Sequence, residues 1–199
     1  MTAAGDLRRV GADYELVGGL ARRQEEQAAS LTPVMQRWDG TWRMAIAIGR
    51  DARPAPVRVE MRGTLRRARL AEWREGVWIR PRNIETIEDP RCAWLDAWPD
   101  DDPGALAARL FAPARWSRSA MGLIARLDRA TAQLEADPAV GIAPAFVAGA
   151  AALRHIRADP LLPPALLPTD WPGLELRRAY VAYERRFHTA ARAWFRGAG

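Results

Sequence analysis

Residues 159–173 combine many apolar side chains with five prolines, and this combination limits how the segment can fold. The prolines are Pro160, Pro163, Pro164, Pro168 and Pro172. Because proline lacks a backbone N–H and restricts the residue before it, the segment cannot form a long regular helix. Its leucines and Trp171 must therefore be buried against elements formed elsewhere in the chain. The sequence predicts an extended strap laid over helices; a clamp for a ligand or a second subunit is the alternative.

Residues 38–115 alternate between strand and helix signals. After a turn at residues 38–41, the apolar run from Trp42 to Ile48 is short enough to be a strand buried on both faces. Four apolar residues at helical spacing then predict a helix: Val57, Met61, Leu65 and Ala68. Strands at 76–80 and 92–98 and a helix at Leu106, Leu110 and Phe111 follow. The order strand, helix, strand, strand, helix is most of a ferredoxin-like unit.

Strand signals end near Trp116, so residues 116–199 are predicted to be all helix. Two helices are marked by apolar residues, one at Met121, Ile124, Leu127 and Leu134, the other at Phe146, Leu153 and Ile156. The last helix has the clearest period, with Leu176, Tyr180, Tyr183, Phe187 and Trp194 on one stripe.

The first 37 residues predict a small appendage. Residues 6–17 form two strand-like runs separated by turn-forming residues near Gly11, which predicts a β-hairpin. Residues 20–35 are rich in helix formers but carry only a thin apolar stripe, which predicts a mostly exposed connecting helix. The fold class is therefore α+β.

The charge of the chain is a weak guide to its partners. The net charge is +6, and all 30 residues counted as Lys or Arg are arginine. A coding sequence rich in G and C favours arginine whatever the protein does, so the charge points only modestly to polyanions such as nucleic acid. A single cysteine, Cys92, excludes an internal disulfide and predicts a small buried hydrophobe. No signal peptide or membrane span is evident, which predicts a soluble cytoplasmic protein.

Three stretches together resemble the PaaX family of bacterial transcriptional regulators. They are residues 38–43 (WDGTWR), 76–81 (GVWIRP) and 159–173 (DPLLPPALLPTDWPG). That family combines an N-terminal winged helix, a central ferredoxin-like domain similar to Cas2 proteins, and a helical C-terminal domain. The resemblance covers nearly the whole chain. It implies a wing hairpin with a linker helix at 1–37, the Cas2-like domain at 38–115, and the helical domain at 116–199.

The resemblance also implies a function. Members are homodimeric regulators, usually repressors of an aromatic or acyl-CoA catabolic operon, released from operator DNA by an acyl-CoA such as phenylacetyl-CoA. Residues 6–17 resemble only the wing, and the helix-turn-helix that precedes it in the family is absent here. A wing can contact only the sugar-phosphate backbone of DNA, so we expect specific operator binding to need a longer form of the protein. Either the start codon lies further upstream, which we favour, or the chain is a natural fragment that dimerises.

Seven residues are candidate contacts. Arg8 and Arg9 in the wing are candidates for DNA phosphates, and the candidates for the effector are Trp78, Arg80, Arg154, Arg157 and Trp171. The alternatives are solvated surface for the wing arginines, a core position for Trp78 and packing for the strap.

Two other functions compete with regulation. A Cas2-like metal-dependent nuclease would need acidic residues near the end of the first strand, yet residues 42–50 contain no carboxylate and only Asp51 follows. A chain that only dimerises would form mixed dimers with a full-length relative. His155 and His188 are far apart in sequence and lack nearby carboxylates, and no phosphate-binding loop or nucleophile elbow occurs. The sequence therefore predicts no enzyme, no cofactor and no metal site.

Overall fold

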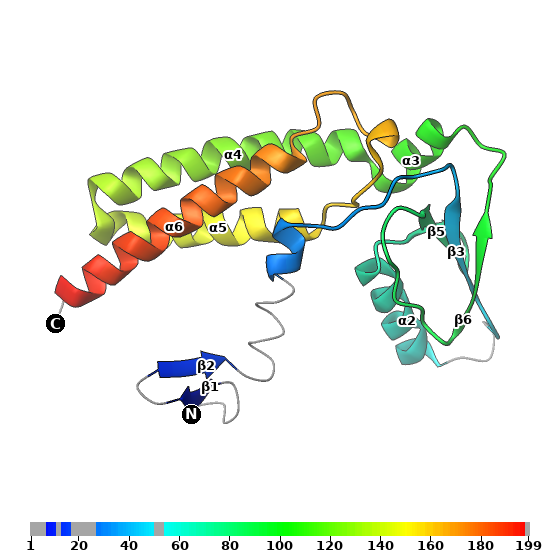
Figure 1. The fold of residues 1–199 in the computed structure, drawn as a ribbon, viewed down its shortest axis with the longest axis horizontal. Coiled ribbons are helices and arrows are strands. Elements are labelled where there is room, and N and C mark those ends of the chain that lie inside the picture. The colour runs from blue at the N-terminus through cyan, green and yellow to red at the C-terminus, as the bar shows by residue number, and fades with distance from the viewer. Residues whose placement is uncertain (1–6, 11–12, 17–26, 50–53, 198–199) are drawn as a thin grey trace. The chain divides into compact units, whose positions relative to one another are not determined.

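The computed structural model describes residues 7–10, 13–16, 27–49 and 54–197, which fall into two compact units (Figure 1). The sheet unit contains residues 34–119 and 160–172. The helical unit contains residues 120–159, 173–199 and the described part of 1–33. Most of the strap therefore belongs to the sheet unit, although the helices on either side of it in sequence belong to the helical unit. The sequence-based boundaries at 37 and 115 stay predictions.

A four-stranded antiparallel sheet forms the centre of the sheet unit. Its strands, β3 (Trp42–Ala47), β4 (Ala71–Arg74), β5 (Val77–Pro81) and β6 (Cys92–Ala97), lie in the order β4-β5-β3-β6. Helix α2 (Ala55–Arg67) connects β3 to β4, and β5 lies between those two strands, as in a split βαβ unit. Helix α3 (Pro103–Phe111) follows β6. The α+β class and the ferredoxin-like sheet are confirmed, whereas the predicted chain order is not, because three strands rather than two lie between α2 and α3.

Two elements of this unit were not predicted: strand β4 and a single 3-10 turn, η2 (Pro164–Leu166), within the strap that was expected to be extended. Two of the four residues of β4, Glu72 and Arg74, are charged, and none of the four is fully buried, so no alternating apolar pattern marks it. Its pairing with β5 depends on the tight turn at Gly76, whose φ of 74° lies in the left-handed region.

Both faces of the sheet are covered at most positions of β3, as predicted, although Ile46 and Ile48 of the same apolar run are 38% and 53% exposed. On one face Trp42 and Met44 of β3 and Ile79 of β5 pack against α3. On the other face Ala45 of β3 and Trp78 of β5 pack against α2. Successive strand residues point to opposite faces, so a strand between two covering layers is apolar at nearly every position.

The strap packs on the sheet unit, which differs from the prediction that it lies over the C-terminal helices. Leu162 and Leu166 are buried in the cluster that contains Trp42, Ile79 and Leu106. Helix α3 has only nine residues and is too short to cover this sheet face alone. The strap supplies the missing apolar surface.

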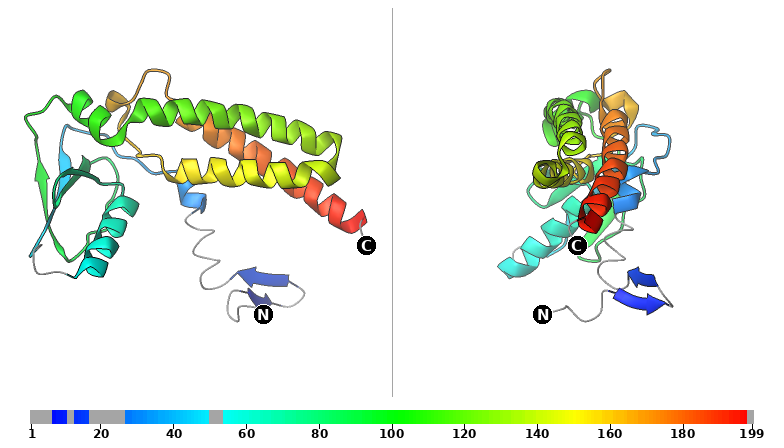
Figure 2. Two further views of the ribbon diagram at one scale, coloured as in Figure 1. Left: turned by 180° about the vertical axis from the view of Figure 1, so that it is seen from behind. Right: turned by 90° about the vertical axis from the view of Figure 1, so that its left-hand side faces the viewer.

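Three long helices form the helical unit. They are the part of α4 (Pro113–Ala136) after Ser119, α5 (Pro138–Arg157) and α6 (Gly173–Gly197). The start of helix α5 is fixed by an N-cap, because the side chain of Asp137 accepts a hydrogen bond from the backbone of Ala139 at 3.0 Å. Figure 2 shows α5 and α6 side by side. The all-helical prediction is confirmed for the residues that the structure describes.

The buried face of α5 consists of small residues. These are Gly141, Ala145, Ala148, Gly149 and Ala152, together with Ile156. The apolar stripe predicted for α5 was wrong at Phe146, which is 63% exposed. The stripe predicted for α4 was wrong at Met121, which is 48% exposed. Small side chains let neighbouring backbones approach closely, whereas a search for large apolar residues overlooks them.

The N-terminal predictions are confirmed in part. Strands β1 (Leu7–Val10) and β2 (Asp13–Leu16) pair antiparallel, with Arg8 opposite Glu15. The predicted turn at residues 11–12 lies outside the described residues, as does the start of the predicted helix. The described part of that helix ends at Leu31 rather than at Met35, because Pro33 follows and disfavours a helical residue before it.

Candidate functional site

The interior of the sheet unit contains two of the predicted effector contacts. Trp78 is 1% exposed and lies in the apolar cluster under α2, and Arg80 is fully buried two residues further along β5. Trp78 therefore lies in the core, which was the predicted alternative to an effector contact. A direct contact of either residue with an effector stays a prediction.

Arg80 anchors the start of the strap. Its guanidinium donates to the carbonyl of Leu161 at 3.1 Å and to the side-chain oxygen of Asn83 at 2.9 Å. The Asn83 amide donates to the same Leu161 carbonyl at 2.9 Å, and both side chains are fully buried. Leu161 has a φ of 50°, a conformation that a leucine rarely adopts, so these buried hydrogen bonds hold a strained bend.

Trp171 anchors the other end of the strap. Its ring stacks on that of Trp116, at the start of α4, with 4.3 Å between the ring centroids and 21° between the planes. Stacked aromatic pairs contribute about 0.5–1.5 kcal/mol beyond the area that they bury. The strap is therefore fixed on both sides of residues 162–170.

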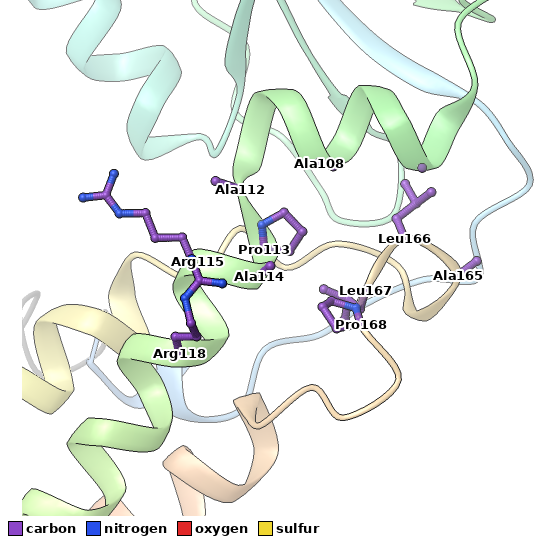
Figure 3. Close-up of a pocket in the computed structure, with 11 residues that line it drawn as sticks. Ala108, Ala112, Pro113, Ala114, Arg115, Arg118, Ala165, Leu166, Leu167 and Pro168 are labelled. Atoms are coloured by element: carbon purple, nitrogen blue, oxygen red, sulfur yellow. The ribbon is translucent and has the colours of Figure 1, made fainter.

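A pocket of about 500 Å³ lies where the middle of the strap meets α3 and the first turns of α4 (Figure 3). Its lining residues are Gly104, Ala108, Ala112, Pro113, Ala114, Arg115, Arg118, Ala165, Leu166, Leu167 and Pro168. Arg115 and Arg118 are exposed and supply the charged groups, while the other lining residues are small or apolar. An apolar surface with two arginines among its lining residues suits a ligand that has an apolar part and an anionic part.

Arg80 and Trp171 position one wall of this pocket without lining it. Both fix the ends of the strap segment that contributes Leu166, Leu167 and Pro168. Arg115 and Arg118 were not predicted, because nothing in the sequence distinguishes them from other exposed arginines.

The remaining predicted contacts lie in the other unit. Arg154 and Arg157 are exposed in the last turn of α5, where a positive charge is favourable near the helix C-terminus. Arg8 and Arg9 lie on β1, with their backbones opposite Glu15 and Tyr14. None of these four residues lines the pocket.

A second buried arginine, Arg177 of α6, was not predicted. It is 7% exposed and forms an ion pair of 2.8 Å with the buried carboxylate of Asp159. Its guanidinium also donates to the carbonyls of Ser30 at 3.1 Å and Gly173 at 2.9 Å. Asp159 and Gly173 are the two ends of the strap, and Ser30 belongs to the helix that precedes the sheet unit. Arg177 therefore holds three chain segments at one point.

No metal site is evident among the residues that the structure describes, which contain no group of three His, Cys, Asp or Glu side chains that could hold an ion. Asp51, the carboxylate on which a nuclease would depend, lies outside the described residues. Within the described ranges, only α5 is long and apolar enough to cross a membrane, and 33% of its most apolar stretch is buried in the protein.

Comparisons with known proteins agree with this architecture. The PaaX protein central Cas2-like domain matches residues 35–89, and the PaaX-like protein C-terminal domain matches residues 117–197. The solved structure of an uncharacterized protein from Mycobacterium tuberculosis, Rv0674, is 33% identical, with a TM-score of 0.78 over 94% of this chain and 79% of that one. A search of curated proteins finds no match. With both characteristic domains in order and a relative of this identity over most of its length, the chain belongs to the PaaX family.

Proposed function

We propose that this chain supplies dimerisation and effector binding to a cytoplasmic, homodimeric transcriptional repressor whose release from operator DNA is controlled by an acyl-CoA. The main support is the presence of both PaaX family domains in one chain. In the proposed complex with DNA, Arg8 and Arg9 of the β1–β2 hairpin contact phosphates. Such contacts give affinity without sequence preference, and specificity comes from a recognition helix.

The pocket beside the strap is the proposed effector site. An acyl-CoA carries an apolar acyl group and several phosphates, and the pocket pairs an apolar wall at Leu166 and Leu167 with the guanidinium groups of Arg115 and Arg118. Arginine is suited to phosphate because its planar donors bind two oxygens at once. Phenylacetyl-CoA is the proposed representative of this ligand class.

The strap supplies a route from this pocket toward the DNA-binding end of the chain. A ligand that displaces Leu166 changes the packing of the strap, whose two ends contact Arg177. Arg177 also holds the carbonyl of Ser30, in the segment that connects the hairpin to the sheet unit. We propose that the effect of the ligand passes from Leu166 through the strap to Arg177 and then to Ser30, and that this change releases the repressor from DNA.

The test is a DNA mobility shift by a version of the protein extended upstream of Met1, with the genomic DNA that flanks the gene of this protein, titrated with phenylacetyl-CoA. The proposal expects a shift that the acyl-CoA reverses and that free coenzyme A does not. A shift that no acyl-CoA reverses would reject the effector, and the absence of any shift would favour the dimerisation-only function.

The effector site has its own test by isothermal titration calorimetry. Arg118→Ala should weaken acyl-CoA binding about tenfold to a hundredfold, because a hydrogen bond to a charged group contributes about 1.5–3 kcal/mol. Arg126→Ala, at another exposed position of α4, is the matched control and should bind like the wild type. If Arg157→Ala weakens binding and Arg118→Ala does not, the site is at the end of α5 instead.

A further inference from the structure

The outer face of α5 is apolar and uncovered. Val140 and Val147 are 58% and 52% exposed, and Ala143, Pro144 and Ala150 beside them are also exposed. Phe146 lies at the edge of this face toward α6, with its ring centroid 6.5 Å from that of Phe187. No charged residue occurs between Asp137 and Arg154. An exposed apolar stripe of this length on a folded helix marks a contact surface rather than ordinary surface variation.

The opposite face of the same helix already forms the core of the helical unit. A Cβ atom at Gly149 would lie 2.5 Å from the ring of Tyr183, and the hydroxyl of that tyrosine donates to the Ala145 carbonyl at 2.8 Å. One face of α5 is therefore committed to α6, and its outer face needs a different partner.

The pattern of side-chain sizes along the outer face is complementary to itself. In an antiparallel pair of α5 helices centred on position 145, Val140 lies opposite Ala150 and Ala143 lies opposite Val147. Each large side chain then faces a smaller one, which is what an interface between two identical surfaces requires.

The charges at the two ends of the helix fit the same register. Asp137 at the start of one α5 lies next to Arg154 near the end of the other, twice by symmetry. Both side chains are exposed, and each neutral stripe lets two molecules of net charge +6 meet without bringing arginines together. The antiparallel arrangement also pairs the opposite ends of the two helix dipoles.

We infer that the outer face of α5 binds a second copy of this chain through an antiparallel α5–α5 contact. This inference rests on the proposed function only in that the regulator is a homodimer. What it adds is the face of the chain that forms the dimer and the register of the two α5 helices. A single pair of helices buries less than a stable interface of about 1,600 Å², so the dimer dissociates on dilution unless other surfaces contribute.

Sedimentation-velocity ultracentrifugation over a dilution series tests the face. The wild type is expected to be dimeric at high concentration, and Val147→Arg monomeric, because it places two guanidinium groups in the apolar interface. Met121→Arg is the matched control, since Met121 is an exposed apolar residue of α4 with a similar exposed fraction, 48%. It should dimerise like the wild type, and far-UV circular dichroism should show all three proteins folded.

A second variant tests the register. Ala143→Glu combined with Val147→Arg places a carboxylate opposite the new guanidinium of the other copy, so the double variant should recover much of the dimer that Val147→Arg loses. Adding salt should weaken the double variant more than the wild type.

Three outcomes would overturn the inference in different ways. If the wild type is monomeric throughout, the homodimer of the proposed function fails as well. If Val147→Arg dimerises like the wild type, only the α5 face fails and the dimer stands. If the wild type binds vesicles of neutral phosphatidylcholine and Val147→Arg does not, the face contacts lipid rather than a second copy.

Discussion

Gly141→Ala should destabilise the protein, although alanine is the better helix former. In a helix interior, replacing glycine by alanine stabilises by about 0.5–1 kcal/mol through backbone entropy. At position 141, however, the new Cβ would lie 2.5 Å from the Cα of Leu134 and 2.9 Å from the carbonyl oxygen of Gln133. Carbon atoms in contact are about 3.5–4.0 Å apart, so the backbone must shift by about 1 Å.

The size of the effect follows from these two opposing contributions. Overpacking of a tight site costs about 1–3 kcal/mol, and here the neighbouring atoms are backbone, which cannot move aside as a side chain can. After subtraction of the gain in helix propensity, the free energy of unfolding should fall by about 1 kcal/mol, and by no more than about 2.5 kcal/mol.

Gly122→Ala provides a matched control. Gly122 lies in α4, and a Cβ there meets nothing within 4 Å, so only the helix-propensity gain applies. Urea unfolding followed by far-UV circular dichroism should show Gly122→Ala more stable than the wild type and Gly141→Ala less stable. If both variants gain stability to the same extent, the close approach of α5 to α4 is wrong.

Three further changes test other parts of the structure. Asp159→Asn leaves the guanidinium of Arg177 buried without its ion pair, so urea unfolding should show a loss of about 3–5 kcal/mol; unchanged stability would mean that the pair is dispensable. Leu162→Ala removes a side chain that is 1% exposed, which should cost about 2–5 kcal/mol when followed by tryptophan fluorescence, and a cost near zero would contradict the packing of the strap. Burial, and then the charge of Glu184, raise the pKa of Tyr183 to about 12. The folded protein therefore keeps the phenol proton after the unfolded chain loses it, and stability should fall as the pH rises from about 10 to 12. This fall should be smaller in Tyr183→Phe, and an identical alkaline profile would refute the assignment.

The sequence predicted best those elements whose apolar residues alone explain their burial. Strand β3 has covering layers on both faces, so its run from Trp42 was unambiguous. In α2, Met61 and Leu65 are buried at the predicted helical spacing. In both cases the local pattern and the final packing agree, which is why reasoning from one sequence works there.

Prediction failed where burial depends on what an element packs against. The face of α5 that enters the core carries alanine and glycine, because α4 and α6 approach closely there, whereas Phe146 lies at the edge of that face, 63% exposed and beside Phe187 of α6. No periodicity of large residues can show this. The strap is a second example. Its leucines predicted that the segment is buried, but the sequence did not show that the sheet and α3 bury it.

The amino-acid composition explains why the arginines of the candidate site could not be identified from the sequence. With arginine as the only strongly basic residue type in 199 residues, a single arginine carries almost no information about its position. The two arginines that the structure buries, among the residues that it describes, are Arg80 and Arg177. Arg80 could be singled out because it lies in the apolar stretch GVWIRP, whereas nothing in the sequence context of Arg177 distinguishes it from the many exposed arginines.

These two arginines play parallel parts in the two units. Arg80 and Asn83 hold the strap at the carbonyl of Leu161, and the carbonyl of Asn83 accepts a hydrogen bond from the backbone of Gln36 at 2.7 Å. Arg177 holds both ends of the strap together with Ser30.

In each unit, a buried cluster that contains an arginine therefore joins the strap to residues 30–36, the segment that leads from the hairpin into the sheet unit. A guanidinium has five donors in one plane and can reach several carbonyls at once, which a lysine ammonium cannot do with the same geometry. Arginine at these two positions is therefore a structural requirement, whatever bias in the coding sequence supplied the other arginines.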